Sequence, residues 1–379
     1  MKFISKARNL EGKRILLRSD INSDVVNGRV FISGRIKEAS KTIKFLKNKR
    51  ARIVVVAHQG QKGKEDFISL KEHSKILSKF VKIKFVKDVV GEKAVKAIKK
   101  LKNGDVLLLD NLRFLDEETN PSVKNNRLTK VLVPLFDLYV NDAFSVCHRE
   151  HTSMVEFPKK LPGFAGLLLE KELNALKKIK MNGSVYILGG AKPKDYIPLL
   201  GENKVLSCGL FGQSCLVAQG KNLGFQDKYL EKEADLNSEL KEKLKNKMRN
   251  VVTPSDFAVK INGKRVEIPL EKFPSKYEIF DIGEKTIDKY VNEIKKAKAV
   301  YMKGPAGDFS SKGFEKGTFA ILRAISEMKG FSLVGGGHLS DAIKMSKIPE
   351  RKFNHISLSG GALLEHVAGK KLPGLEALR

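Results

Sequence analysis

Phe331-Ser-Leu-Val-Gly-Gly-Gly-His-Leu-Ser-Asp-Ala-Ile343 is the stretch that decides the fold. A short apolar run ends at three glycines and a helix-compatible segment follows, which predicts a strand, a tight turn and a helix. Glycines let a ligand approach the backbone closely, and unpaired N–H groups at the start of a helix suit an anion such as a phosphate. Taken alone, the stretch is also explained as a turn that only joins a strand to a helix.

The composition limits the class of protein. The chain has 379 residues, which suits two domains, and 41% apolar residues, which can build buried cores. No apolar run is long enough to span a membrane, and the N-terminus lacks the apolar segment of a secretory signal. Cys147, Cys208 and Cys215 have no metal-ligand spacing, so we expect a cytoplasmic, reducing setting without disulfides.

The net charge of +29 indicates an attraction for anionic partners. Nucleic acid is one candidate, but the basic residues are spread along the chain in short groups. A basic tail, a zinc finger and an RNA-binding aromatic pattern are all missing from the sequence. We therefore expect most lysines to lie on solvated helix surfaces and no nucleic acid to bind.

Strands alternate with helices along the chain, which predicts an α/β fold with parallel sheets. The expected strands are 13–18, 51–57, 83–86, 105–110, 138–143, 184–188, 205–208, 251–256, 299–302, 331–334 and a last one from 355. The expected helices are 36–46, 70–80, 92–101, 128–136, 167–176, 236–247 and 286–298, with a turn at 280–283. Pro158 and Pro162 indicate a break between two domains, and the helix from 167 is a candidate connector.

Charged side chains follow the strands of the first half. Arg18, Asp20 and Asn22 end the first strand, and His58, Arg113, His148 and Arg149 follow later strands, while Arg35 starts the first helix. Because the carboxyl ends of parallel strands share one edge of a sheet, these groups are expected to converge. A single arginine is explained as a surface ion pair, but the set predicts a small, highly anionic ligand.

Glycines, in contrast, follow the strands of the second half. They stand at 189–190, 209, 304, 307, 335–337 and 360–361, with Lys192 beside the first pair. Backbone turns of this kind suit the phosphates and flat base of a nucleotide. The two kinds of edge together suggest phosphoryl transfer across a cleft between two domains.

The sequence gives less support to a P-loop, a dinucleotide site, a metal site or a catalytic thiol. The P-loop motif and the Gly-x-Gly-x-x-Gly fingerprint of dinucleotide-binding folds are both missing from the sequence. His148-x-x-His151 lacks a third ligand, so no metal site is predicted. Cys147 has no partner that would activate it, so we expect a half-buried thiol and not a nucleophile.

A series of motifs over the whole chain resembles the phosphoglycerate kinase family, and His-Gln after the second strand resembles its archaeal branch. The motifs are Leu17-Arg-Ser-Asp-Ile-Asn22, Val56-Ala-His-Gln-Gly60, Leu109-Asp-Asn-Leu-Arg-Phe114, Val140-Asn-Asp-Ala-Phe144 with His148-Arg149, Leu188-Gly-Gly-Ala-Lys192, Thr253-Pro-Ser-Asp-Phe257, Asp281-Ile-Gly-Glu-Lys-Thr286, Gly304-Pro-Ala-Gly307, Val334-Gly-Gly-Gly337 and Leu372-Pro-Gly374.

The resemblance implies reversible transfer of a phosphoryl group from 1,3-bisphosphoglycerate to ADP, giving 3-phosphoglycerate and ATP, with Mg²⁺. It implies a cytoplasmic monomer that uses small-molecule substrates and no membrane. Two Rossmann-like domains with a hinge-bending cleft are expected. They comprise a phosphoglycerate-binding domain (1–157, with a C-terminal return at 360–379), a connector helix (163–180) and a nucleotide-binding domain (181–355).

Matching motifs also imply the site residues. The positions expected to bind phosphoglycerate are Asp20, Ile21, Asn22, Arg35, His58, Gln59, Gly60, Gln61, Arg113 and Arg149. The positions expected to bind the nucleotide are Gly189, Gly190, Lys192, Cys208, Gly209, Pro305, Ser310, Gly335, Gly336, Gly337, His338 and Leu339. The catalytic roles fall on Arg35, Lys192 and Gly337, with Arg35 expected to stabilise the phosphoryl group in transit. Lys303 replaces a usual asparagine and adds positive charge near the phosphates.

Two hypotheses follow from the sequence. The first is an active kinase, in which positioning and charge neutralisation suffice because the acceptor is already an anion. The second is a non-catalytic protein on the same fold that binds nucleic acid, in view of the net charge.

Overall fold

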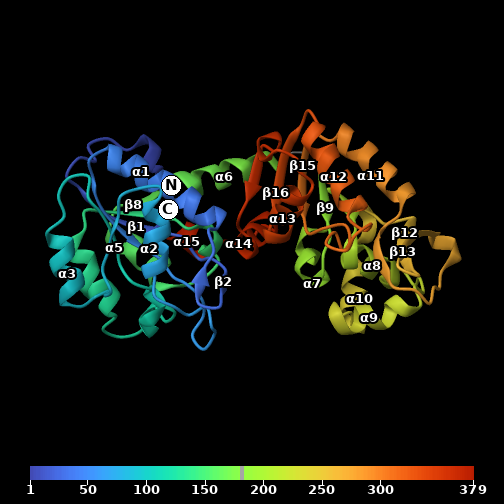
Figure 1. The fold of residues 1–379 in the computed structure, drawn as a ribbon, viewed down its shortest axis with the longest axis horizontal. Helices are drawn as coiled ribbons and strands as arrows, with labels where there is room; N and C mark the ends of the chain where they lie inside the picture. The colour runs from blue at the N-terminus through green and yellow to red at the C-terminus, as the bar shows by residue number, and fades with distance from the viewer. Residues whose placement is uncertain (180–182) are drawn as a thin grey trace. The chain divides into compact units, whose positions relative to one another are not determined.

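A computed structural model describes residues 1–179 and 183–379 of the chain (Figure 1). Packing divides the chain into two compact units, residues Met1–Leu173 with Gly369–Arg379, and Asn174–Ala368. Each unit is built on a six-stranded parallel sheet, so the predicted α/β class with two parallel-sheet domains is confirmed. Residue 180, the expected end of the connector helix, and 181–182, the expected start of the second domain, lie outside the described residues.

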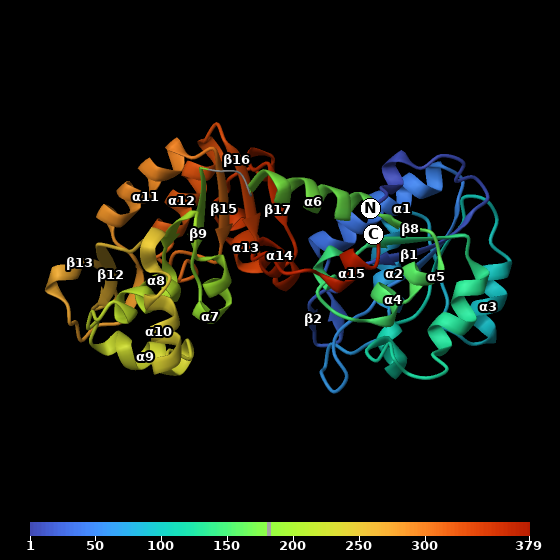
Figure 2. The ribbon, with the colours of Figure 1, turned by 180° about the vertical axis from the view of Figure 1, so that it is seen from behind.

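The first unit contains the sheet β5-β6-β4-β1-β7-β8, in which every neighbouring pair is parallel. Its strands are β1 (Arg14–Ser19), β4 (Arg52–Val56), β5 (Lys84–Phe85), β6 (Val106–Leu108), β7 (Leu138–Asp142) and β8 (Gly163–Ala165). Its helices are α1 (Gly34–Asn48), α2 (Lys71–Ser78), α3 (Glu92–Lys99), α4 (Thr152–Val155), α5 (Phe157–Lys160) and α15 (Pro373–Glu376). Both chain termini belong to this unit (Figures 1 and 2).

The core of the first unit follows from the two-residue period of its strands. Ile15 and Ile53 belong to one apolar cluster with Ile36 and Ile43 of α1. Leu16, the next residue along β1, faces the opposite side of the sheet and is also fully buried, so both faces of the sheet are covered. This is the usual state of a parallel sheet and explains why its strands are continuously apolar.

The second unit contains the parallel sheet β11-β10-β9-β15-β16-β17. Its strands are β9 (Ser184–Leu188), β10 (Lys204–Ser207), β11 (Val251–Val252), β15 (Ala299–Lys303), β16 (Phe331–Gly335) and β17 (His355–Ser357). Its helices are α7 (Pro193–Tyr196), α8 (Gly209–Ala218), α9 (Phe225–Glu233), α10 (Ser238–Lys245), α11 (Glu284–Lys296), α12 (Lys316–Glu327), α13 (Gly337–Met345) and α14 (Gly361–Val367). The helix α6 (Leu167–Ile179) contributes residues to both units.

Two antiparallel elements were missed by the sequence analysis. The first is the three-stranded sheet β13-β12-β14, formed by β12 (Asp256–Ile261), β13 (Lys264–Pro269) and β14 (Ile279–Ile282). The second is the hairpin of β2 (Val25–Val26) and β3 (Arg29–Val30). The expected strand 251–256 is therefore split between β11 and β12, and the expected turn at 280–283 is wrong, because most of it is β14.

Three other expectations need correction. Residues 128–136 form a π-helical turn, η4 (Leu128–Leu132), and a 3₁₀ turn, η5 (Val133–Leu135), since Pro134 cannot continue the helix. The proline-containing segment 156–163 holds α5 and enters β8, which pairs with β7, so the connector helix begins at 167 and not at 163. The chain joins the first unit again at 369 and not at 360.

Short helical turns complete the structure: η1 (Ile4–Lys6), η2 (Leu112–Phe114), η3 (Asp116–Glu118), η6 (Phe144–Val146), η7 (Ile197–Leu199), η8 (Met248–Asn250), η9 (Leu270–Lys272) and η10 (Glu350–Lys352). Among the described helices, none combines the length and apolar character needed to cross a bilayer.

Asp142, the last residue of β7, ties the sheet to the start of α6. Its Oδ1 accepts hydrogen bonds from the backbone N–H groups of Leu168 (2.8 Å) and Leu169 (3.3 Å). A Cβ added to Gly166 would lie 2.2 Å from this oxygen. The carboxylate therefore caps the helix only because residue 166 is a glycine.

We predict that Gly166→Ala lowers the free energy of unfolding by about 2 kcal/mol, the scale of overpacking a buried site. The methyl group displaces Asp142 and weakens its bonds to α6. Gly201→Ala is the matched control, because a Cβ there meets no atom of the described residues within 4 Å. Chemical denaturation followed by circular dichroism measures both variants, and equal stability of the two would contradict this role for Gly166.

Candidate active site

The carboxyl-terminal edge of the first sheet brings the predicted phosphoglycerate residues together. The strands β6, β4, β1 and β7 are neighbours, so the segments that follow them share one edge. From β1 the chain continues to β4 on one side and later returns to β7 on the other side. Such a switch in strand order leaves a crevice in which parallel sheets bind ligands.

Arg35 is held at this edge by the residues that follow β1. It is the second residue of α1, whose first turn is capped by the Ser33 hydroxyl, which accepts from the Ile36 N–H at 3.5 Å. Its Nε lies 3.3 Å from Oδ2 of the buried Asp20, and its Nη1 donates to the Asn22 carbonyl at 3.3 Å. The Arg35 side chain remains 30% exposed, so it is held by these contacts and is still accessible.

His58 presents a defined nitrogen to the site because of Arg18. Nη2 of the fully buried Arg18 lies 2.9 Å from His58 Nδ1. A guanidinium can only donate, so Nδ1 accepts and the neutral ring carries its proton on Nε2. Burial, followed by the charges of Arg18 and Arg113, holds the pKa of His58 well below its usual value. His58 therefore offers a neutral N–H donor to a ligand.

A buried carboxylate lies below these groups. Ser153 Oγ accepts from Arg18 Nε at 2.9 Å and donates to Glu118 Oε1 at 2.6 Å. The Ser153 N–H donates to Glu118 Oε2 at 3.0 Å. Burial raises the pKa of Glu118, although the charge of Arg18 opposes this. The sequence analysis missed Glu118 and Ser153, since neither belongs to a recognisable local pattern.

Several guanidinium groups at this edge lie close enough to lower the pKa of their neighbours. Burial, followed by the charges of Arg149 and Arg18, lowers the pKa of Arg113 to about 10. Burial, followed by the charges of Arg18, Arg113 and Arg149, lowers the pKa of His151 to about 3. Arg113 also donates from Nη1 to the Gly60 carbonyl, while Arg149 is exposed and donates from Nε to His148 Nε2 at 3.3 Å. Cations that destabilise one another in this way are stabilised by a bound anion.

Two predicted ligand-binding side chains are engaged elsewhere. Gln59 is fully buried, and its amide accepts from the Ser23 N–H at 2.9 Å and donates to the Ser23 carbonyl at 3.0 Å. Ile21 is fully buried in the apolar core. These two side chains therefore face the protein interior, and Gln59 positions the loop after β1 through its contacts with Ser23.

Gly60 and Gln61 lie in the loop after β4. A Cβ on Gly60 would lie 2.2 Å from the carbonyl oxygen of Asp66, so only glycine fits this turn. The Gly60 N–H donates to Asn22 Oδ1 at 2.9 Å, which joins the loops after β1 and β4. Gln61 is exposed, and its N–H donates to Asp66 Oδ1 at 3.4 Å.

The glycines after β9 and β15 allow close packing of the turns themselves. The two strands are neighbours at the switch point of the second sheet. A Cβ on Gly189 would lie 2.1 Å from the Pro305 carbonyl oxygen, and a Cβ on Gly304 would lie 2.1 Å from the Gly189 carbonyl oxygen. A Cβ on Gly209 would lie 2.7 Å from the nitrogen of Gly190. Backbone packing therefore explains these glycines without any ligand.

The turn after β16 is different. Gly336 has a φ of +113°, which favours glycine, and its N–H donates to the Ser357 carbonyl at 3.3 Å. Gly337 begins the nine-residue helix α13, and a Cβ on it would meet no atom of the described chain within 4 Å. The first N–H groups of a helix lack partners within that helix. This open helix start fits an anion better than the packed turns do.

Two lysines lie near one another at this edge. Lys192 is exposed immediately before α7. Lys303 ends β15, and burial lowers the pKa of Lys303, while the charge of Asp195 opposes this effect and the charge of Lys192 adds to it. Tyr196 is buried, and its hydroxyl donates to the Gly189 carbonyl at 2.5 Å, so it supports the turn from below.

The remaining positions expected to bind the nucleotide differ in their burial and in their hydrogen bonds. Cys208 is fully buried, its thiol donates to the Leu188 carbonyl at 3.4 Å, and burial raises its pKa. Leu339 lies in the apolar core, so the side chains of Cys208 and Leu339 both face the protein interior. Ser310 is exposed and donates to Asp308 Oδ1 at 2.5 Å. His338 is exposed beside Gly337, and Pro305 lies against Gly189.

Neither a metal centre nor a reactive thiol emerges from the other candidates. Within residues 1–179 and 183–379, no three His, Cys, Asp or Glu side chains are grouped so that they could hold a metal ion. Cys147 is fully buried and not half-buried as expected. Burial raises the pKa of its thiol to about 12, which makes it a poor nucleophile.

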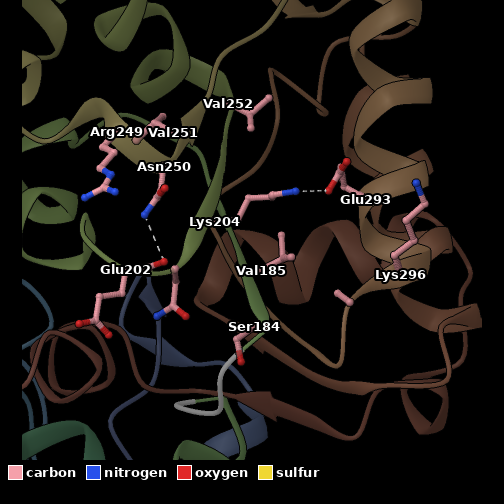
Figure 3. A pocket seen from close by; sticks show the side chains of 13 residues that line it. Ser184, Val185, Glu202, Lys204, Arg249, Asn250, Val251, Val252, Glu293 and Lys296 are labelled. Carbon is pink, nitrogen blue, oxygen red and sulfur yellow. Dashed lines mark hydrogen bonds and ion pairs between the residues drawn. The ribbon is translucent and has the colours of Figure 1, made fainter.

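A pocket of 840 Å³ lies at the opposite, amino-terminal edge of the second sheet (Figure 3). It is lined by the first residues of β9, β10 and β11, and Lys204 pairs with Glu293 at 2.6 Å within it. The predicted site residues do not line it. Because ligands of parallel sheets bind at the carboxyl ends of the strands, this pocket is not the nucleotide site.

Comparisons with known proteins agree with this geometry. Residues 4–370 match the family model described as phosphoglycerate kinase. The chain is 37% identical to the phosphoglycerate kinase of Methanopyrus kandleri, covering 97% of this chain and 95% of the relative. It is 39% identical to that of Sulfolobus acidocaldarius, covering 97% and 94%.

Solved structures show the same relationship. The crystal structure of phosphoglycerate kinase from Pyrococcus horikoshii OT3 superposes with a TM-score of 0.88 at 34% identity, covering 100% of this chain and 98% of the other. The enzyme from Coxiella burnetii gives a TM-score of 0.82 at 28% identity, covering 99% and 98%. The family resemblance seen in the motifs is therefore confirmed, and the chain belongs to the phosphoglycerate kinase family.

Proposed function

We propose that the chain catalyses the reversible transfer of a phosphoryl group from 1,3-bisphosphoglycerate to ADP, which yields 3-phosphoglycerate and ATP. Family membership supports this reaction. The observation that carries it is the gathering of guanidinium groups at the edge of the first sheet, where Arg35 lies beside Asp20, and where burial, followed by the charges of Arg149 and Arg18, lowers the pKa of Arg113. A substrate with two phosphates supplies negative charge that pairs with these guanidinium groups.

The two units take different substrates in this proposal. The first unit is the phosphoglycerate-binding domain and the second is the nucleotide-binding domain, with α6 as the connector helix. His58 donates its Nε2 proton to the anionic substrate, and Asp20 and Asn22 hold Arg35. On the nucleotide side, Lys192 and the N–H groups from Gly337 onward bind phosphate oxygens.

The chemistry requires positioning and charge neutralisation. The bond between phosphorus and the acyl oxygen breaks while a β-phosphate oxygen of ADP bonds to the same phosphorus. The acceptor oxygen is already anionic, so no general base is needed. Arg35 stabilises the equatorial oxygens of the phosphoryl group in the transition state, where charge is spread over them. Water must be excluded, because it would hydrolyse the acyl phosphate.

Magnesium enters this proposal as part of the substrate. The described residues offer no cluster of carboxylates that could hold the ion. Mg²⁺ is commonly bound through nucleotide phosphates and water with few protein ligands. MgADP and MgATP are therefore the species that bind, and the ion neutralises phosphate charge when it is present.

The proposed setting is a monomer in the cytoplasm that binds small molecules and no nucleic acid. Cys147, Cys208 and Cys215 are buried free thiols, which fits a reducing compartment. The net charge of +29 is the observation that favours nucleic-acid binding instead. Affinity for DNA or RNA that falls steeply with salt would support that second function.

We predict that the purified protein forms 1,3-bisphosphoglycerate from 3-phosphoglycerate and MgATP in a coupled assay. Excess EDTA should stop turnover without changing the melting temperature, since the metal arrives with the nucleotide. Absence of turnover at saturating substrates, together with salt-sensitive binding of nucleic acid, would refute the kinase function.

We predict that Arg113→Gln weakens binding of 3-phosphoglycerate by about 10- to 100-fold, the range for losing a charged hydrogen bond. Arg52→Gln is the control, because Arg52 begins β4 at the opposite end of the strand that precedes His58. Isothermal titration calorimetry measures both affinities. An equal effect of the two substitutions would show that only the total charge matters.

We predict that Arg35→Ala lowers kcat by more than about 100-fold, the scale for losing a cation that stabilises the transition state. The KM for the nucleotide should change little, because Arg35 lies on the phosphoglycerate edge. Steady-state kinetics measure both quantities. Turnover close to that of the unmodified chain would remove Arg35 from the mechanism.

A further inference from the structure

Arg18 is held in one orientation below the edge of the first sheet, because each nitrogen of its guanidinium group has a partner. Nε donates to Ser153 Oγ at 2.9 Å, and Nη1 donates to the Ser19 carbonyl at 2.6 Å. Nη2 lies 2.9 Å from Nδ1 of His58, which accepts from it. Arg18 is fully buried, so water does not compete for these bonds. The proton position on His58 therefore depends on the group that holds the Nε side of Arg18.

That group is the Ser153 hydroxyl, and Glu118 determines which way it points. Glu118 Oε1 accepts from the hydroxyl at 2.6 Å, and Oε2 accepts from the Ser153 backbone N–H at 3.0 Å. Because the hydroxyl proton points to Glu118, a lone pair of Ser153 Oγ remains for Arg18 Nε. Both Ser153 and Glu118 are fully buried. The hydrogen bonds therefore run in one direction, from Arg18 through Ser153 to Glu118.

We propose that Ser153 and Glu118 are positioning residues for the phosphoglycerate substrate. Glu118 orients the Ser153 hydroxyl, and this hydroxyl holds Arg18. Arg18 in turn occupies His58 Nδ1, which keeps the ring proton on Nε2 and leaves that N–H for the ligand. Both residues act through Arg18 and His58 and do not touch the ligand themselves. This inference rests on the proposed function and adds a supporting layer to its phosphoglycerate site.

The competing explanation is a purely structural role. Glu118 ends η3, which follows Arg113 of η2, and Ser153 belongs to α4, which follows Arg149. The contact between Glu118 and Ser153 therefore also joins the two segments that carry these arginines. If this were its whole role, its loss would displace both segments and weaken binding, but the proton of His58 would stay on Nε2.

Substitutions can remove the contact with little change in volume. Ser153→Ala removes the hydroxyl, so Arg18 Nε loses its acceptor. Glu118→Gln keeps the shape of the side chain but replaces one acceptor oxygen with an NH₂ group that faces a Ser153 donor. Ser153→Thr retains a hydroxyl and is the conservative variant. Ser74→Ala is the matched control, because it removes a buried hydroxyl of the same unit that donates to the Lys71 carbonyl within α2.

The first measurement locates the His58 proton by ¹⁵N NMR of the histidine rings near neutral pH. Burial, followed by the charge of Arg18, keeps the pKa of His58 low, so the ring is neutral there. The His58→Gln variant assigns the signals. The unmodified chain and Ser74→Ala should carry the proton on Nε2, whereas Ser153→Ala and Glu118→Gln should distribute it over both ring nitrogens. Ser153→Thr should restore the Nε2–H form.

The second measurement is the affinity for 3-phosphoglycerate by calorimetry. It should fall about tenfold in Ser153→Ala and in Glu118→Gln, the scale of one charged hydrogen bond, and recover in Ser153→Thr. A double-mutant cycle then tests whether the loss runs through His58. In the His58→Gln background, Ser153→Ala should lower the affinity little further, because the interaction that it weakens is already gone.

Unchanged affinity in Ser153→Ala and Glu118→Gln would overturn the inference while the proposed function stands. A loss of affinity that leaves the His58 proton on Nε2, or that is equally large in the His58→Gln background, would also overturn it in favour of the structural role. If circular dichroism shows that Ser153→Ala is unfolded, Glu118→Gln decides by the same measurements, and unfolding of both variants overturns the inference as well. If the unmodified chain did not bind 3-phosphoglycerate, the proposed function itself would fail.

Discussion

The buried positive charge of Arg18 is the constraint on which the phosphoglycerate edge depends. Ser153 and Glu118 hold its guanidinium from one side, and His58 Nδ1 accepts from the other side. This arrangement fixes which His58 nitrogen carries the proton. Burial lowers the pKa of Arg113 and His151, and the charge of Arg18 adds to this effect. Because these cationic groups lie together at one edge, a bound anion would stabilise them.

At the carboxyl edge of the second sheet, backbone N–H groups contribute much of the positive potential that an anion would need. Most of its glycines let neighbouring turns pack closely, and the open position at Gly337 is the place where the backbone faces outward. The ammonium groups of Lys192 and Lys303 lie at the same edge. Side-chain cations thus dominate one edge, while backbone N–H groups and two lysines dominate the other. This division suits the proposed reaction. In it, the phosphoryl donor 1,3-bisphosphoglycerate is held firmly, and the nucleotide, with its phosphates, binds and is released.

Much of the fold was predictable because buried parallel strands are short, continuously apolar and separated by amphipathic helices. Among the missed antiparallel strands, β2, β3 and β13 are short or partly exposed and therefore resemble loops in sequence, whereas β12 and β14 are mostly buried. A signal was present: Asn27-Gly28 and Asn262-Gly263 both have positive φ and join β2 to β3 and β12 to β13. Asn-Gly between two extended segments is the strongest short-range indication of a hairpin. Pro134 likewise marked the interruption of the expected helix 128–136.

By itself, the sequence determined the two parallel sheets, the residue types at their carboxyl edges and the family, because strand periodicity and motif order are local properties of the chain. It did not determine which side chains face a ligand. Gln59 and Ile21 stand in the same motifs as His58 and Asp20, yet they point into the protein interior. Glu118 comes within hydrogen-bond reach of Ser153, 35 residues away, and through it supports Arg18. Only the tertiary structure decides such contacts, because burial and charge pairing depend on segments that meet in space.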